Sequence, residues 1–265
     1  MKTIHSPQVA SNRAWQQTLN IYLLEAKTEF LKAFRMPAFS IPSLIFPVMF
    51  YVFFALVFNR GGMGGQMPTY LLATYGVFGI MGPALFGFGV GVAIEKDQGW
   101  LALKQCSPIP ISAYFFARIF TAMQFALIIV LSLFVIGGIF GDVKLTTFQW
   151  AVTLCLLIMG TLPFCALGLW MGLALKGQTA PAVVNLIYLP MAFLSGLWIP
   201  MQMFPKVLEY VAWALPPFHL AQLVLKIQHN DLGHPWIIHA AVLGVMSLMF
   251  LFLALRAFKR ISEAN

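Results

Sequence analysis

Long runs without a charged residue constrain this 265-residue chain more than any other feature of its sequence. No Asp, Glu, Lys or Arg occurs between Arg35 and Arg60, and five further runs of this kind follow. Because an α-helix needs about 20 mostly apolar residues to cross a bilayer, each run can hold one membrane span. Trimming the loop residues predicts six spans, near residues 38–58, 70–94, 115–140, 149–175, 180–200 and 235–256.

The composition excludes the other classes of protein. Apolar residues make up 60% of the chain and charged residues only 9%, whereas a soluble domain carries about 25% charged residues. Such apolar blocks also exclude disorder, and three cysteines exclude a disulfide scaffold, so we expect Cys106, Cys155 and Cys165 to be unpaired. We therefore predict an all-α integral membrane protein in which a single six-span domain, residues 36–265, follows a cytoplasmic segment, residues 1–35.

The distribution of Lys and Arg predicts the orientation, because cytoplasmic loops carry an excess of both. With the N-terminus inside, 12 of the 16 basic residues fall on the inner side and 4 on the outer side. We therefore expect a multi-pass protein of the cell membrane with both termini in the cytoplasm. This bias also explains most of the net charge of +8, and the sequence has no basic groove with an aromatic reading surface, so nucleic acid is not an expected partner.

Residues 14–35 predict an amphipathic helix that lies in the plane of the membrane interface. This helix is either an elbow that leads into the first span or a docking element for a cytoplasmic partner, and the two roles are compatible. Its apolar face is predicted to consist of Trp15, Leu19, Tyr22, Leu23, Ala26, Phe30 and Phe34.

The loop between the second and third spans, residues 95–110, is expected to bind another protein. From Glu95 to Pro108 it combines four charges with one Trp, and it can form about two helical turns before Pro108. Trp100 and Leu103 would be exposed on this short helix, which is typical of a partner-binding surface. The alternative is a helix that lies on the lipid headgroups.

Two further segments depart from plain membrane helices. The second span is rich in glycine, and the pair Gly87 and Gly91 predicts close helix packing, with a gating hinge at Gly82–Pro83 as the alternative. Residues 200–230 are apolar but interrupted by prolines, so they cannot form one continuous helix. We expect short, broken, re-entrant helices there, on the outer side, with protein covering the freed backbone groups.

Polar residues inside the predicted spans are few. Gln124, Asn185 and Tyr188 are candidates for a substrate path, with interhelical hydrogen bonding as the alternative. We expect no acid or base inside the spans, which argues against a proton- or ion-coupled secondary carrier.

No motif predicts catalysis or metal binding. His229, His234 and His239 are five residues apart and point in different directions on a helix. Ser195 with His219 or His239 as base lacks a nucleophile elbow. The chain also lacks the Gly-Lys-Ser/Thr sequence of a phosphate-binding loop. We expect no catalytic residue, no metal and no cofactor in this chain.

Taken together, the motifs resemble the permease subunit of the type-2 family of ATP-binding-cassette (ABC) exporters, over nearly the whole chain. The loop after the second span matches the family pattern at Glu95, Gly99, Leu103 and Pro108. The segment after the fifth span matches at Ser195, Gly196, Pro200, Pro205 and Pro216, and the tail matches at Phe258, Lys259 and Arg260.

The resemblance implies a division of labour between subunits. The loop would be a coupling helix seated in a groove of a separate ATPase subunit, which binds ATP and Mg, so this chain would not itself be an enzyme. Two ATPase chains and a second permease, either another copy or a related chain, would complete the exporter in a prokaryotic inner membrane. The coupling residues would be Glu95, Gly99, Trp100, Leu103, Lys104 and Pro108, and the outer gate would comprise Gly196, Pro200, Pro205 and Pro216.

We expect the cargo to be hydrophobic or amphipathic, because Phe and Met are abundant and Met-rich surfaces adapt to varied ligands. A drug, an antibiotic, a lipid and a glycan all remain open, and the cargo would leave the cytoplasm or the inner leaflet. Two alternatives stand beside this expectation. One is a secondary carrier that works without an ATPase, and the other is a non-transporting membrane partner of an ATPase or sensor complex.

Overall fold

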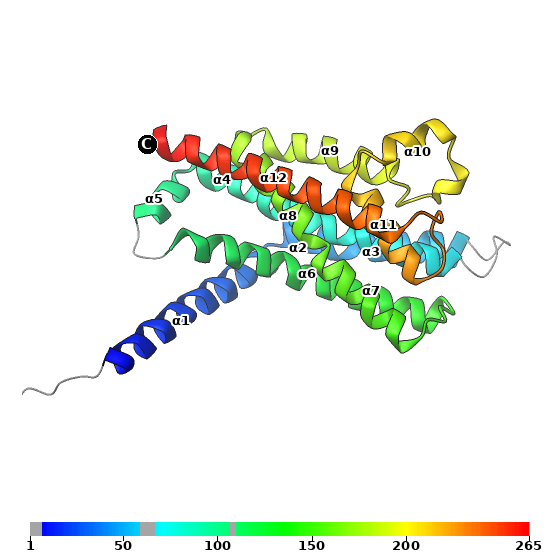
Figure 1. Cartoon of the computed structure of the whole chain (residues 1–265), viewed down its shortest axis with the longest axis horizontal. Helices are drawn as coiled ribbons and strands as arrows, with labels where there is room; N and C mark the ends of the chain where they lie inside the picture. Colours follow the sequence, from blue (N-terminus) through cyan, green and yellow to red (C-terminus); the bar gives the residue numbers. More distant parts are fainter. Residues whose placement is uncertain (1–6, 59–66, 107–109, 265) are drawn as a thin grey trace, which may run out of the picture.

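The computed structural model describes residues 7–58, 67–106 and 110–264, and every regular element within these ranges is a helix (Figure 1). The all-α class is therefore confirmed. The helices of the first half are α1 (Pro7–Phe34), α2 (Pro37–Tyr51), η1 (Val52–Val57), α3 (Met67–Ala84), η3 (Leu85–Val90), α4 (Gly91–Asp97), α5 (Trp100–Cys106) and α6 (Ile111–Phe140). Those of the second half are α7 (Thr147–Met159), α8 (Thr161–Ala174), α9 (Ala180–Leu194), η4 (Met201–Met203), α10 (Lys206–Ala212), α11 (Pro216–Ile227) and α12 (Trp236–Ala264).

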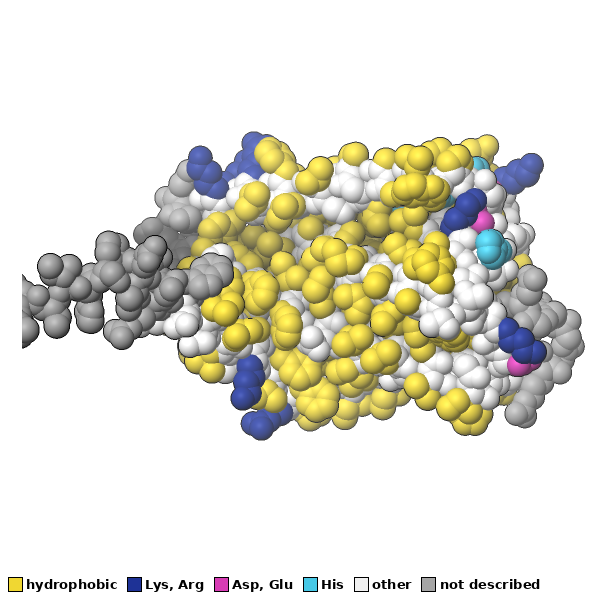
Figure 2. Space-filling model, turned by 60° about the horizontal axis from the view of Figure 1, so that its bottom comes forward, with side chains coloured by type: hydrophobic (Ala, Val, Ile, Leu, Met, Phe, Trp, Pro, Cys, Tyr) yellow, Lys and Arg dark blue, Asp and Glu magenta, His cyan; other side chains and the backbone are white. Residues whose placement is uncertain are grey.

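Helices long and apolar enough to cross a membrane occur five times in the described chain. Hydrophobic side chains also cover the middle of one face, with Lys and Arg gathered toward its two ends (Figure 2). This pattern fits a bilayer with charged groups at its surfaces. The five candidate spans are Pro37–Val57, Met67–Asp97, Ile111–Phe140, Thr147–Ala174 and Trp236–Ile261.

The predicted span at residues 180–200 corresponds to a shorter apolar helix, α9, which has 15 residues. At about 1.5 Å per residue such a helix covers only about 22 Å, less than the bilayer core of roughly 30 Å. The helix ends at Leu194, and Gly196 follows with a φ of +72°, a left-handed conformation that suits glycine and turns the chain. The predicted count of six spans is therefore not reached by long helices alone.

The second candidate span is the centre of the bundle, because nearly every α3 side chain is buried. Pro83 lies inside α3, and the chain continues from it into η3, a six-residue π-helical segment, before α4 begins. A proline inside a helix removes a backbone donor, and a local change of helical winding accommodates the loss. The span therefore stays continuous through the predicted hinge at Gly82–Pro83.

Close backbone packing in the bundle comes from glycines of α8. A Cβ atom on Gly168 would lie 2.8 Å from the carbonyl oxygen of Ala84, and one on Gly172 would lie 2.6 Å from that of Phe88. Both distances are too short for a real side chain, so only glycine permits α8 to lie this near α3 and η3.

The predicted close packing of the glycine-rich second span is borne out at Gly79 and Gly89, where a Cβ atom would lie 2.6 Å from Ile129 and 3.0 Å from Val184. The pair Gly87 and Gly91 does not take part in this packing. A Cβ atom on Gly87 would meet no atom within 4 Å, and one on Gly91 would meet the guanidinium of Arg118 instead of another helix backbone. Gly91 therefore makes room for a charged side chain, and Gly87 faces open space.

Helix α1 leaves the bundle at the end where α5 lies (Figure 1). The Tyr22 hydroxyl lies 2.6 Å from Ser112 Oγ of α6, and the ring of Phe30 packs against Phe125. Leu19 and Leu23 of the predicted apolar face are exposed, so that face is only partly packed. The side chain of Trp15 lies outside those that the structure describes.

Candidate functional site

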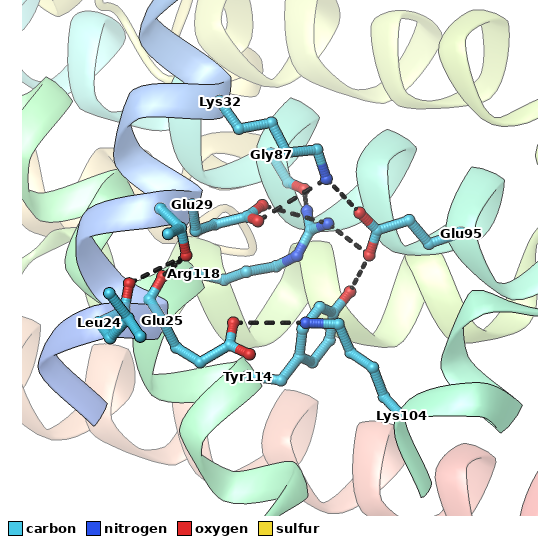
Figure 3. A network of polar contacts seen from close by, with 10 residues as sticks. Leu24, Glu25, Glu29, Lys32, Gly87, Glu95, Lys104, Tyr114 and Arg118 are labelled. Carbon is cyan, nitrogen blue, oxygen red and sulfur yellow. Dashed lines mark hydrogen bonds and ion pairs between the residues drawn. The ribbon is translucent and has the colours of Figure 1, made fainter. Parts of the chain in front are cut away.

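A cluster of charged side chains joins α1, α4 and α6 at the end of the bundle that carries α5 (Figure 3). We call it the polar cluster and define it by two acids, two bases and one tyrosine. Its members are Glu29, Lys32, Glu95, Tyr114 and Arg118.

Arg118 is the buried centre of the polar cluster, with 6% of its side chain exposed. Its Nη2 atom lies 2.7 Å from Glu95 and 3.3 Å from Glu29, and its Nη1 atom donates to the carbonyl of Gly87. A buried cation is tolerated only where anions and acceptors surround it. Arg118 therefore binds α6 to both α1 and the second candidate span.

Glu95 accepts hydrogen bonds from three sides. Lys32 Nζ lies 2.5 Å from one carboxylate oxygen, while the Tyr114 hydroxyl at 2.6 Å and Arg118 at 2.7 Å share the other. Such charge-assisted bonds are stronger than bonds between neutral groups. Glu95, which the sequence placed in the coupling set, therefore also belongs to this interior network.

The polar cluster overturns one expectation from the sequence. Arg118 lies within the candidate span Ile111–Phe140, and Glu95 lies within Met67–Asp97. The expectation that the spans hold no acid or base is therefore wrong at this end of the bundle. The argument against a secondary carrier, which rested on the absence of charged residues from the spans, therefore no longer holds.

Helix α5, Trp100–Cys106, forms the middle of the predicted coupling loop and presents an apolar surface. The Gly99 backbone has a φ of +77° and starts the helix, since Leu103 N donates to the Gly99 carbonyl. Leu101 is buried at 3% exposure, whereas Trp100 and Leu103 are 55% and 63% exposed. The helix is therefore anchored by one leucine and exposes its other large apolar side chains.

Contacts on both sides of α5 fix its position. Lys104 Nζ lies 3.4 Å from Glu25 of α1 and 4.6 Å above the ring centre of Tyr114. Lys96, at the end of α4, donates to two carbonyl oxygens at the end of α8, and Asp97 accepts from the backbone of Gly177 at 2.7 Å. Pro108 of the predicted coupling set lies outside the described residues.

The predicted outer-gate residues lie along one folded segment at the other end of the bundle. Tyr70 of α3 holds this segment, since its hydroxyl donates to the carbonyl of Gly196 at 3.5 Å and accepts from Met201 N at 3.3 Å. Pro205 immediately precedes α10, and Pro216 is the first residue of α11. Pro200 comes just before η4. Prolines thus divide the segment into short helices.

The candidate path residues do not form a common lining. Gln124 is half-buried on α6, Asn185 is exposed on α9, and Tyr188, three residues further along α9, is buried. The Tyr188 hydroxyl donates to the carbonyl of Phe78 at 3.3 Å, and the two rings stack at 5.2 Å. For Tyr188 the structure fits the alternative of interhelical hydrogen bonding.

The structure contains a buried pair of histidines that was not predicted from the sequence. His219 Nδ1 lies 3.0 Å from His239 Nδ1, and His219 Nε2 lies 2.8 Å from the Trp213 carbonyl. From the sequence, both His219 and His239 were named, but His239 was considered with His229 and His234, and the two were not paired. Within the ranges that the structure describes, no three metal-binding side chains come together.

Glu29, Tyr114 and Arg118 of the polar cluster were not predicted as site residues. Each lies beside or near the start of an apolar run, where a charge or a tyrosine normally marks the membrane surface. A signal was present in the spacing of Glu25 and Glu29, which share one face of α1 a single turn apart.

Comparisons with known proteins agree with this architecture. The family model described as ABC-2 type transporter matches residues 22–229. YvfS of Bacillus subtilis (strain 168), a protein that carries the name of a transport permease, is 28% identical over 244 residues, which cover 91% of this chain and 98% of that protein. The chain therefore belongs to the ABC-2 type transporter family and is a transmembrane permease subunit of an ABC transporter.

Proposed function

We propose that this permease is the transport subunit of an ATP-driven exporter and moves a hydrophobic or amphipathic substrate out of the cytoplasm or the inner leaflet. Membership of the family implies an ABC ATPase partner. ATP and Mg would bind to that separate subunit, because this sequence lacks a phosphate-binding loop.

The exposed surface of α5 is the observation that carries the proposal. Trp100 and Leu103 expose an aromatic and an aliphatic side chain on one short helix, an apolar patch typical of an interaction site, and Trp is enriched among the residues that dominate binding. Leu101 anchors the helix from its other side. This surface supports a coupling helix that docks on the ATPase subunit.

The polar cluster gives α5 a route to the membrane helices. Lys104 pairs with Glu25 of α1, and α4, which precedes α5, carries Glu95 into contact with Arg118 of α6. A displacement of α5 when the ATPase subunits close would therefore pull on α1, α4 and α6 together. Packed helices respond to such a pull by moving between discrete arrangements.

The arrangement in the membrane follows from the Lys and Arg bias. Both termini would lie in the cytoplasm, α1 would lie at the inner interface, and α9 would serve as a short sixth span. The segment with Gly196, Pro200, Pro205 and Pro216 would then lie outside and form the outer gate. Gln124, Asn185 and Tyr188 stay candidates for contact with the moving substrate.

Asn185 supports a second permease in the assembly. It is exposed on α9 next to Leu186, which is exposed as well, in a helix that is otherwise apolar. An amide that faces lipid has no hydrogen-bond partner, whereas a facing helix can supply one. We propose that a second copy of this chain, or a related permease, covers this face, and that each permease binds one ATPase subunit.

A pull-down from membranes tests the proposed function. The tagged full chain is solubilised in mild detergent, and the masses of its partners and the rate of ATP hydrolysis are recorded. We expect an ATP-hydrolysing subunit to co-purify with the permease. The substitution Trp100→Asp should lower the amount of this subunit that is recovered by about tenfold or more. Trp236→Asp is the matched control, because Trp236 is exposed to a similar extent, 58%, and lies outside α5.

Three other results would contradict the proposal in different ways. Full recovery of the ATPase with Trp100→Asp would refute the docking role of α5. Transport by a preparation that contains no ATPase would identify a secondary carrier. An ATPase partner whose activity no transported substrate stimulates would identify a non-transporting membrane partner.

A further inference from the structure

A cavity of about 920 Å³ lies between α1, the start of α2, the end of α3, η3, α4, α5 and α6, next to the polar cluster. Its volume falls in the range of about 300–1,000 Å³ that is typical of sites for small molecules. The cavity adjoins the exposed surface of α5 that we assign to the ATPase subunit, because Trp100 and Lys104 contribute to its wall, whereas Leu103 of that surface does not.

The wall of the cavity is divided into an apolar part and a charged part. Aromatic and aliphatic side chains form the apolar part, among them Phe39, Phe86, Val90 and Phe125. The charged part consists of Glu25, Glu29, Lys32, Glu95, Lys104 and Arg118. A ligand that fills this cavity therefore needs an apolar body and a polar head, which is the definition of an amphiphile.

The charges of the wall cancel. Three acids face three bases, and the acids and bases pair with one another at distances of 2.5 to 3.7 Å. A ligand with a net charge would have to give up its hydration without a matching unpaired charge, which is costly. The wall therefore favours a head without net charge.

We propose that this cavity binds a membrane amphiphile whose polar head has no net charge. The binding site itself stands on the cavity, and only its role as the point of entry for cargo rests on the proposed function. Helix α1 covers the cavity from the membrane interface, so the ligand would come from the inner leaflet.

Photolabelling of the full chain tests the proposal. A monoacylglycerol with a diazirine in its chain is the neutral probe, and the fatty acid and the alkyl trimethylammonium with the same tail are the charged comparators. We expect the neutral probe to label peptides of α1, η3 and α6 most strongly. Stronger labelling of these peptides by either charged probe would overturn the proposal.

Gly87 offers a direct way to fill the cavity. It lines the wall, and a Cβ atom there would meet nothing within 4 Å, so Gly87→Phe places a ring in open space. We expect this variant to lower labelling by about tenfold. Gly138→Phe is the matched control, since Gly138 is exposed on α6 with equally open space and should leave labelling unchanged.

A second variant keeps the test valid if Gly87→Phe fails to fold. Val90→Phe adds a ring to the apolar part of the wall, so we expect clearly weaker labelling by the neutral probe. Unchanged labelling in both folded variants would refute the site. Labelling needs neither ATP nor the ATPase subunit, so a failure of export would leave this result standing.

A final labelling experiment distinguishes transported cargo from a resident lipid. When ATPase subunits and ATP are added before irradiation, loss of labelling identifies cargo, and retained labelling identifies a resident lipid of the bilayer. Both results support the cavity as a binding site for a neutral amphiphile.

Discussion

Arg118 on α6 and Glu95 on α4 form an ion pair of 2.7 Å that is buried at one end of the helix bundle. Through Glu29 and Lys32 the same pair holds α1, and through α4 it lies next to α5. The surface proposed to receive the ATPase subunit and the helices proposed to move the substrate therefore meet at one charged contact.

Neutralising Glu95 should destabilise the bundle. Glu95→Gln leaves Arg118 with Glu29 as its remaining anionic partner, and an incompletely compensated buried charge costs about 3–5 kcal/mol. The apparent melting temperature of the purified permease in detergent should fall clearly. Asp142→Asn is the control, because its pair with Lys144 is almost fully exposed and should contribute nothing measurable. Equal melting temperatures for both variants would contradict the assignment of Arg118 as a buried centre.

Gly91 should tolerate no side chain, although Gly87, one helical turn away, should. A Cβ atom on Gly91 would collide with the Arg118 guanidinium, whereas one on Gly87 would meet open space. Both substitutions replace Gly by Ala in a helix and gain the same helix propensity. The difference in stability between the two variants therefore reports the steric crowding at Gly91, which typically costs about 1–3 kcal/mol. We expect Gly91→Ala to melt below the wild type and Gly87→Ala at or above it. The reverse order would show that Arg118 lies elsewhere.

The turn at Gly99 should control docking of the ATPase subunit. Its φ of +77° costs a residue with a Cβ atom about 1–2 kcal/mol, and Asn tolerates this conformation better than Val. A Cβ atom there meets nothing within 4 Å, so any effect comes from the backbone. Gly99→Val should reduce co-purification of the ATPase while Gly99→Asn retains it, with equal membrane insertion. Equal loss with both variants would point to a role other than the turn.

The sequence allowed the membrane helices to be located because length and lack of charge are local properties. The short helix before Pro108 was predictable for the same reason, since a proline and a glycine delimit it. The polar cluster was not predictable, because Glu29, Glu95 and Arg118 are distant in sequence and each adjoins an apolar run. The packing of α1 and α4 around Arg118 of α6 brings them together.

Two further differences have physical causes. Gly87 and Gly91 fit a packing motif, but spacing does not say which neighbour a glycine faces, and the close approach occurs at Gly168 and Gly172 of α8 instead. The apolar run after Lys176 predicted a full span, but the chain turns at Gly196. The Tyr70 hydroxyl donates a hydrogen bond to the Gly196 carbonyl at this turn.

The exposed amide of Asn185 should lie near its counterpart in a second copy. We expect Asn185→Cys, in a chain whose three cysteines are replaced by Ala, to form a disulfide-linked dimer on mild oxidation, since a disulfide requires Cα atoms about 4.4–6.8 Å apart. Leu248→Cys on α12 is also exposed and serves as the control. Cross-linking at Leu248 with none at Asn185 would assign the pairing face to α12.

ATP-dependent accumulation of a fluorescent neutral amphiphile in inside-out membrane vesicles tests the central claim most directly. We predict accumulation that requires ATP, survives dissipation of ion gradients, is lost with Trp100→Asp and is retained with Trp236→Asp. Accumulation driven by an ion gradient without ATP, or unaffected by Trp100→Asp, would contradict an exporter that is coupled to an ATPase through α5.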